Sequence, residues 1–303
     1  MKLIRTTMLA LLMATAAVAQ AKDSDREDPA PTEQEELAIA ALEGLMTQSP
    51  ERALPILKKV MAGSQTTIVK RRALFVLSQV GGPEAREIVM QTARSTNLEL
   101  RGEAIRSIGI SGDPKSLDAL NEVYKTSTPE LKEDILQAWM IAGRKDSVYQ
   151  AALNARTEDE ASAAIRMLGV MGATEELRKL AERPNTPEGL VDALAISGDL
   201  AGLRKIADGN GPPRLRLDAV QRIGIINSEA ARAALQEIYT RNTNEEMKEA
   251  ALHGMLISGD EKGVLALYRV AKTTEEKRSL LRMLSMMDGD AALEAIDAAL
   301  EKK

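Results

Sequence analysis

Cysteine is absent from this sequence, and histidine occurs once, as His253. The missing thiol excludes disulfide bonds, a thiolate nucleophile and a zinc site with cysteine ligands. A single histidine excludes a metal centre built on several histidines and leaves a Ser-His-Asp triad one candidate base. The G-x-x-x-x-G-K-[ST], G-x-S-x-G and HExxH motifs are also missing. We therefore expect no catalytic residue, no cofactor and no metal, and we expect the protein not to be an enzyme.

Aromatic residues are scarce, at 2% of the chain, whereas 44% of the 303 residues are hydrophobic. Because β-strands favour aromatic and β-branched side chains, a core of alanine, leucine, isoleucine, valine and methionine favours helices. The composition therefore predicts an all-α protein with a core large enough to fold.

The N-terminus has the three parts of a secretory signal peptide. Lys2 and Arg5 are followed by an apolar stretch over 8–19 and by the A-x-A sequence Ala19-Gln20-Ala21. This stretch is shorter than the roughly 20 residues of a membrane anchor, so we expect no stable membrane insertion. We predict a signal peptide over 1–21, cleaved after Ala21, and export to the periplasm or the extracellular space. Residues 22–32, acidic and containing two prolines, are predicted to form a disordered linker.

Negative charge limits the partners. The net charge is −5, and cleavage after Ala21 would remove two basic residues and no acidic one. A nucleic-acid-binding protein needs a basic face to displace counterions, and adhesion to anionic lipid needs one too. We expect a protein partner and no nucleic acid.

A repeat of 26 to 32 residues, counted between successive turn residues, organises the chain after residue 32. Its turn residues are Gly81, Gly112, Gly143, Gly172, Gly198, Asn227, Gly259 and Asp288. The residues seven, four and two positions before each of them are apolar, with Gln79 as the exception. Apolar offsets of this kind on both sides of a glycine turn predict two amphipathic helices per repeat.

Capping signals agree with this helix–turn–helix unit. Thr157 with Glu160, Thr243 with Glu246 and Thr273 with Glu276 have the spacing of capping boxes. Prolines 114, 129 and 187 each follow a capping residue and are predicted to begin helices.

The segments 104–113, 164–172, 219–227 and 251–260 share this signature, which resembles that of the HEAT-repeat family in its short bacterial form. The resemblance covers about residues 33–303 and implies an α-solenoid of about eight to nine stacked helix pairs. It also implies that the helix before each turn lines a concave face used for binding partners. The short repeat 174–198 and the Gly/Pro-rich segment 208–213 depart from the pattern and mark a candidate bend.

The position six residues before the turn residue is mostly polar, and we call these residues the polar row. The polar row consists of Arg106, Gln137, Arg166, Gln221, His253 and Arg282. It is a candidate surface for an extended peptide or an acidic partner. The alternative is that its members bind neighbouring acids and carbonyl groups of the solenoid itself. For His253, a general base or pH switch is less favoured than a partly exposed helix residue. The Ser-Gly-Asp turns at 111–113, 197–199 and 258–260 are interpreted as helix caps rather than calcium ligands.

These observations favour an exported, non-catalytic scaffold that binds a protein partner through its concave face. The alternatives are a HEAT-like enzyme of the lyase or isomerase type, and a regulatory or chaperone-like module for one envelope client.

Overall fold

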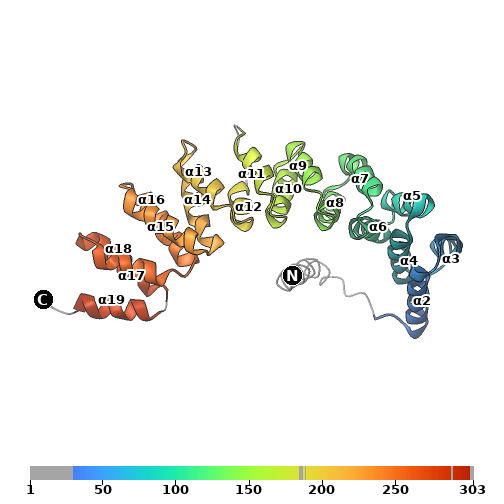
Figure 1. Ribbon diagram of the computed structural model, residues 1–303, viewed down its shortest axis with the longest axis horizontal. Helices are drawn as coiled ribbons and strands as arrows, with labels where there is room; N and C mark the ends of the chain where they lie inside the picture. The colour runs from blue at the N-terminus through green and yellow to red at the C-terminus, as the bar shows by residue number, and fades with distance from the viewer. Residues whose placement is uncertain (1–29, 184–186, 188, 288, 301–303) are drawn as a thin grey trace, which may run out of the picture. The chain divides into compact units, whose positions relative to one another are not determined.

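The computed structural model describes residues 30–183, 187, 189–287 and 289–300, and these residues are helical apart from turns and short connections (Figure 1). The predicted signal peptide over 1–21 and most of the predicted linker lie outside the described residues. The prediction of an all-α solenoid is confirmed: successive helices pair and stack, and no strand occurs in the described ranges. The described helices contain no stretch long and apolar enough to cross a membrane.

Two compact units make up the chain, one ending at Val89 and one beginning at Met90. Helix α5 (Gly82–Ala93) continues from the first unit into the second. The first unit also contains α2 (Glu33–Gly44), the short η1 (Leu45–Thr47), α3 (Pro50–Ala62) and α4 (Thr67–Val80). A capping box starts α2, since Glu35 donates its backbone N–H to Thr32 and accepts the Thr32 backbone N–H in return.

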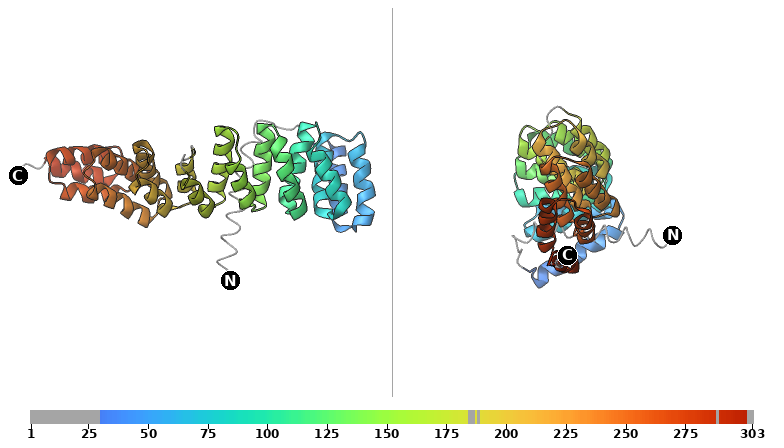
Figure 2. Two further views of the ribbon diagram at one scale, coloured as in Figure 1. Left: turned by 90° about the horizontal axis from the view of Figure 1, so that it is seen from above. Right: turned by 90° about the vertical axis from the view of Figure 1, so that its left-hand side faces the viewer.

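The second unit has two layers of helices. One layer, which we call the inner layer, contains α6 (Leu98–Ser111), α8 (Pro129–Ile141), α10 (Glu158–Val170), α12 (Leu190–Ile196), α14 (Pro213–Ile226), α16 (Glu245–Ile257) and α18 (Thr274–Ser285). The other, the outer layer, contains α7 (Pro114–Thr126), α9 (Lys145–Leu153), α11 (Thr174–Ala181), α13 (Leu200–Asp208), α15 (Glu229–Arg241), α17 (Glu261–Val270) and α19 (Asp290–Leu300). Figure 1 shows the layers most plainly from α7 to α12, and Figure 2 shows the helix pairs stacked in chain order. From α6 to α16, each inner helix packs against the next inner helix.

The core lies between the layers and is built from the expected positions. The residues four before the turn, such as Ile108, Trp139 and Leu168, are fully buried, and so are most of those seven before it. Glycine at the turn is explained by the backbone: the described turn glycines have positive φ, as does Asn227 with φ of 46°.

Four local predictions differ from the structure. Asn244, not Thr243, caps α16, because its side chain accepts the backbone N–H of Met247. Helix α12 begins at Leu190 after Gly189, not at Pro187. Thr157 and Thr273 accept the backbone N–H groups of Glu160 and Glu276 as expected. The carboxylates of Glu160 and Glu276, however, accept the backbone N–H groups of Arg156 and Lys272 and not those of the capping threonines.

Candidate partner-binding surface

The polar row lies on the inner layer, one residue to a helix. Its members are Arg106 on α6, Gln137 on α8, Arg166 on α10, Gln221 on α14, His253 on α16 and Arg282 on α18. The side chains of Arg166, His253 and Arg282 are exposed, and the other three are half-buried. The exception in the row is α12, which carries Asp192 at this position and binds Arg222 of α14 at 2.6 Å.

Most of the polar row is not used by the fold. Within the described residues, Gln137, Arg166, Gln221, His253 and Arg282 make no side-chain hydrogen bond or ion pair, whereas Arg106 has a partner. The expected alternative, in which the row satisfies neighbouring acids, therefore does not describe Arg166 or Arg282. Both guanidinium groups remain able to bind a carboxylate through two parallel hydrogen bonds.

A second row on the same helices was not recognised from the sequence as a surface. The residues two before the turn, which we call the apolar row, are exposed on every inner helix of the second unit. They are Ile110, Ile141, Val170, Ile196, Ile225, Ile257 and Met286, each between 40% and 61% exposed. Angular arithmetic could have found them, because two residues along a helix are 200° apart. The apolar row therefore points away from the buried position at four before the turn.

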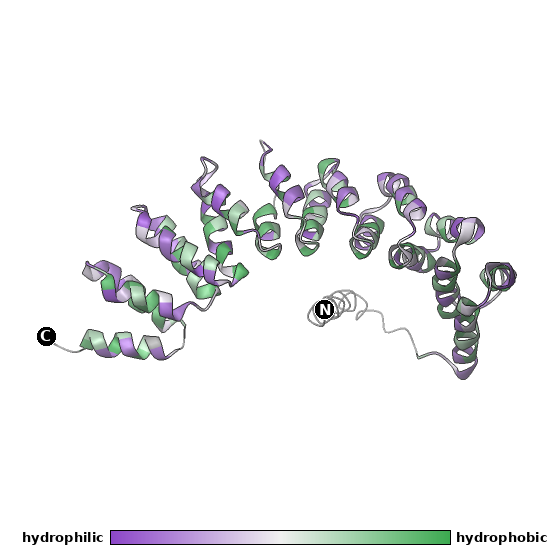
Figure 3. Ribbon diagram, in the orientation of Figure 1, coloured by the Kyte–Doolittle hydropathy of each residue, from purple (hydrophilic) through white to green (hydrophobic). Residues whose placement is uncertain are grey.

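Acidic groups occupy the opposite end of the same helix faces. The first turns of five inner helices expose Glu99, Glu130, Asp159, Glu246 and Glu275, while α14 exposes Arg214 instead. These carboxylates suit the positive end of the helix dipole. Along these five inner helices, the exposed face thus changes from acidic to polar or cationic to apolar. The inner helices α8, α10 and α12 are visibly more hydrophobic in Figure 3 than the tips of the outer helices.

The aspartates of the Ser-Gly-Asp turns cap helices, as predicted. Asp113, Asp199 and Asp260 accept the backbone N–H groups of Ser116, Gly202 and Gly263. Burial of Asp199 opposes ionisation, but the hydrogen bonds from Arg178 and Gly202 outweigh it and hold the pKa of Asp199 below its usual range. In the described ranges, no three acidic or histidine residues come together as a metal site.

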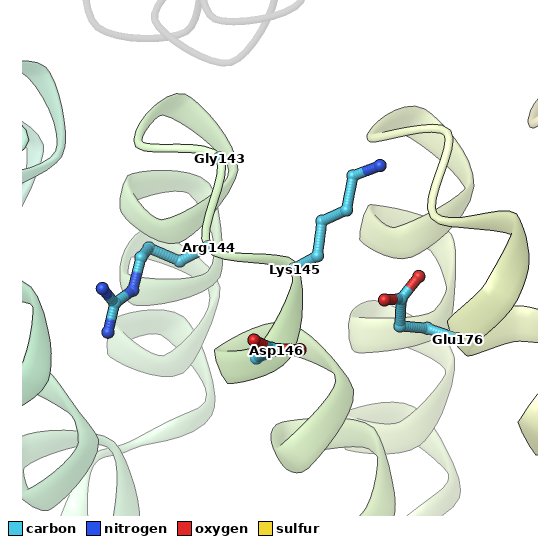
Figure 4. Close-up of a pocket in the computed structure, with 5 residues that line it drawn as sticks. All are labelled: Gly143, Arg144, Lys145, Asp146 and Glu176. Atoms are coloured by element: carbon cyan, nitrogen blue, oxygen red, sulfur yellow. The ribbon is translucent and has the colours of Figure 1, made fainter.

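A charged hollow of about 420 Å³ opens between the start of α9 and α11. Gly143, Arg144, Lys145, Asp146 and Glu176 line it (Figure 4). Arg144 is paired with Asp118, and the Lys145 ammonium donates to the carbonyl of Gly172 at 3.3 Å. Small-molecule sites are mostly apolar and enclosed, so this open hollow does not have the character of a substrate site.

Comparison with known proteins supports the repeat assignment. A family model described as HEAT repeats matches residues 54–139. No curated protein gives a significant match. Among solved structures, human deoxyhypusine hydroxylase in complex with glycerol is 15% identical, over 84% of this chain and 98% of that one, with a TM-score of 0.34. The complex of CpcE and CpcF of phycocyanin lyase from Nostoc sp. PCC7120 is 19% identical, over 86% of this chain and 98% of that one, with a TM-score of 0.33.

These structures correct one expectation. We expected a protein that is not an enzyme, and that prediction is wrong, because the similar structures include a hydroxylase and a lyase complex. A likeness at this level assigns no reaction to the chain. The missing cysteine still excludes a thiolate nucleophile, disulfide bonds and cysteine ligands to zinc.

Proposed function

We propose that this is an exported HEAT-repeat protein whose second unit binds a protein partner through the inner layer. The observation that carries the proposal is the polar row. Arginine and glutamine recur at one position of successive inner helices, and the fold leaves Arg166, Arg282 and both glutamines without partners in the described part of the chain. A polar side chain that is paired within the solenoid has its hydrogen-bond donors occupied. The unpaired arginine and glutamine side chains of the polar row can donate hydrogen bonds to another molecule.

Export is the second part of the proposal and rests on the signal-peptide pattern of residues 1–21. N-terminal sequencing of protein recovered from the periplasm or medium should begin at Lys22. Recovery of the chain only in the cytoplasm, with Met1 retained, would contradict export but would not bear on the proposal that the inner layer binds a partner.

Partner binding is tested by a matched pair of charge variants. Arg166→Gln with Arg282→Gln removes two unpaired charges from the inner layer. The control, Arg204→Gln with Arg241→Gln, removes two charges from the outer layer, where Glu237 and Asp208 already bind them at 2.8 Å and 2.6 Å. Both variants change the net charge equally, so any difference between them is local.

We expect the inner-layer variant to bind the partner captured from envelope extract at least about tenfold more weakly, since even one lost hydrogen bond to a charged group contributes about 1.5–3 kcal/mol. The outer-layer variant should bind as the unmodified protein does. Circular dichroism and melting must be unchanged in both. Equal binding by the two variants would show that the polar row is not the contact surface.

A further inference from the structure

The fold covers only part of each apolar-row side chain and leaves between 40% and 61% of it exposed. A single exposed aliphatic side chain on a protein surface is ordinary, but the apolar row exposes one at the equivalent position of seven successive inner helices. Five of the seven are isoleucine, a β-branched residue with lower helix propensity than alanine or leucine. Local helix stability therefore does not favour these residues, and their partial burial accounts for only part of their apolar surface. A surface that another molecule covers accounts for the rest.

The apolar row and the polar row form one surface. Each polar-row residue lies four positions before an apolar-row residue of the same helix, as Arg166 does before Val170. Residues four apart lie on the same helix face with Cβ atoms about 5–6 Å apart. Each inner helix except α12 thus presents a donor and, one turn later, an aliphatic side chain to the same occupant.

The spacing of the inner helices indicates the conformation of that occupant. Packed helices lie about 8–10 Å apart. In a polyproline II segment, every third side chain falls on the same side after about 9.3 Å, which matches one inner helix per three residues. Side chains on one face of a β-strand recur after about 6.6 Å and do not match.

An α-helical occupant repeats one face every seven residues, after about 10.5 Å, which is close to the spacing of packed helices. The inner helices, however, are not equally spaced, and this disfavours a straight helix as the occupant. Gly109 and Gly169 let α6 approach α8 and α10 approach α12 closely, at Ala138 and Ala193 respectively. The neighbouring pair, α8 and α10, has no such glycine contact, and α12 is only seven residues long. An extended segment without internal hydrogen bonds can follow unequal steps, whereas a rigid helix cannot.

Charge indicates the composition of the occupant. Arg166 and Arg282, which have no partner among the described residues, can each bind a carboxylate. Gln137 and Gln221 can both donate to and accept from the peptide groups that a polyproline II segment leaves free. The acidic first turns of the inner helices repel carboxylates from the far end of the surface. The acidic side chains of the occupant therefore lie over the polar row and its aliphatic ones over the apolar row.

We propose that the two rows bind an extended, acidic segment of another protein that carries an aliphatic residue at about every third position. This inference rests on the proposed function and names the class of partner for the same surface. Other occupants of an apolar surface, namely a second copy of the chain, its own apolar segment over 8–19, or a lipid bilayer, are separated from it by the test.

The probe is a fluorescent peptide of about six Leu-Pro-Asp repeats, which places leucine and aspartate on fixed sides of a polyproline II helix. Three peptides serve as comparisons: Ser-Pro-Asp repeats without aliphatic side chains, Leu-Pro-Lys repeats with reversed charge, and an α-helical heptad peptide of equal leucine and acid content. Fluorescence anisotropy with the chain beginning at Lys22, and with the full chain, gives the affinities. We expect the Leu-Pro-Asp peptide to bind at least about tenfold more tightly than each of the others.

Variants then locate the binding. Ile141→Ser with Val170→Ser should weaken binding of the Leu-Pro-Asp peptide about tenfold, because both side chains would be buried by it. The control, Val270→Ser with Leu293→Ser, removes two exposed side chains of outer helices α17 and α19 and should leave binding unchanged. Ile141 and Val170 are 45% and 47% exposed and Val270 and Leu293 are 69% and 68% exposed, so both variants should fold with unchanged helicity, and only the inner-layer variant should melt at a slightly lower temperature.

Each outcome decides a point. Equal binding of the Leu-Pro-Asp and Ser-Pro-Asp peptides, or tighter binding of the helical or Leu-Pro-Lys peptide, would overturn the proposal. The proposal would also be overturned if the chain dimerises or binds phosphatidylglycerol vesicles and the Ile141/Val170 variant no longer does so. The same holds if the chain beginning at Lys22 binds the peptide but the full chain, with residues 1–21, does not. If Arg166→Gln with Arg282→Gln weakens peptide binding while Ile141→Ser with Val170→Ser does not, the inner layer binds the peptide but the apolar row does not contribute, and the proposal is overturned. If neither variant changes peptide binding, the peptide binds elsewhere and this proposal is overturned, while partner capture with the Arg166/Arg282 variant still decides the proposed function.

Discussion

The two layers of the second unit use their charged residues differently. In the outer layer, arginines bind acids of the next repeat: Arg178 binds Asp199 through two hydrogen bonds, Arg204 binds Glu237, and Arg269 binds Glu294. In the inner layer, most of the polar row binds nothing in the described residues. Ion pairs on an exposed surface contribute little stability, but they occupy the side chains that form them. The comparison shows which arginines remain able to bind a partner.

Stability in the inner layer comes from packing and from one nearly buried ion pair. The side chains of Lys132 on α8 and Glu160 on α10 are 9% and 15% exposed and lie 2.6 Å apart. The Lys132 ammonium also lies 5.3 Å from the ring of Tyr124 on α7. Variants that remove packing, the ion pair or helix contact should therefore separate what holds the inner layer from what its surface does.

Trp139 joins the two layers, and its loss should have the largest effect. It is fully buried on α8, its ring lies 5.2 Å from that of Tyr124, and its indole donates to the carbonyl of Leu117 at 3.4 Å. Trp139→Ala should cost about 3–5 kcal/mol through lost burial and the cavity left behind. Urea denaturation should also show a broader transition, since neighbouring repeats lose their coupling.

Trp139→Phe, which keeps an aromatic ring in the core, is the control and should cost less than Trp139→Ala. A loss below about 1 kcal/mol for Trp139→Ala would mean that α7 and α8 are not coupled through this residue.

The burial of Trp139 could be predicted from the sequence, whereas the exposure of Ile141 could not be predicted from hydrophobicity alone. Both are apolar and both recur in the repeat, so a count of apolar offsets treats them alike. Their directions differ: Trp139 points into the core and Ile141 is exposed. Periodicity identifies the repeat and its turns, while only the helix angle tells which apolar position faces out.

The polar row could be predicted as a set and as a candidate surface, but the sequence does not show which of its side chains have partners within the fold. A shared offset places its members on equivalent helices, yet whether each side chain has a partner depends on contacts between repeats. Asp192 illustrates this: it interrupts the row and binds Arg222, a residue of the next inner helix. Similarly, the sequence predicts Asp199 as a helix cap but does not show that Arg178 binds it.

The Lys132–Glu160 pair should have the second-largest effect on stability. Lys132→Met leaves a nearly buried carboxylate without its partner and should cost about 3–5 kcal/mol. The matched control is Lys125→Met, because Lys125 and its partner Glu122 are exposed, and it should change stability by less than about 0.5 kcal/mol. The double variant Lys132→Met with Glu160→Leu should be more stable than Lys132→Met, since it removes the unpaired charge; chemical denaturation measures all three.

The same pair predicts a pH dependence. The hydrogen bond from Lys132 is the largest cause that holds the pKa of Glu160 below its usual 4.5. A carboxyl group with a lowered folded-state pKa stabilises the protein above its unfolded pKa, and this contribution disappears as the pH falls through the folded value. The free energy of unfolding should therefore fall below pH 4.5, and fall less steeply in Lys132→Met. A parallel loss in both proteins would assign the acid sensitivity to other carboxyl groups.

Two glycines of one helix provide the finest test of how the inner layer is held together. Gly109 and Gly102 both lie inside α6, where alanine is intrinsically the better residue by about 0.5–1 kcal/mol. A methyl group on Gly109 would lie 2.8 Å from Cα of Ala138, a backbone atom of α8 that cannot yield without moving the helix. On Gly102, it would lie 3.4 Å from a carboxylate oxygen of Asp134, at ordinary contact distance.

Gly102→Ala should therefore raise the free energy of unfolding by about 0.5–1 kcal/mol, and Gly109→Ala should lower it by about 1–3 kcal/mol. Because the chemical change is the same, opposite signs in urea denaturation would show that the close approach of α6 and α8 stabilises the inner layer. If Gly109→Ala raised the free energy of unfolding as Gly102→Ala does, the two helices could separate without cost, and the apolar row would be carried by helices of adjustable spacing.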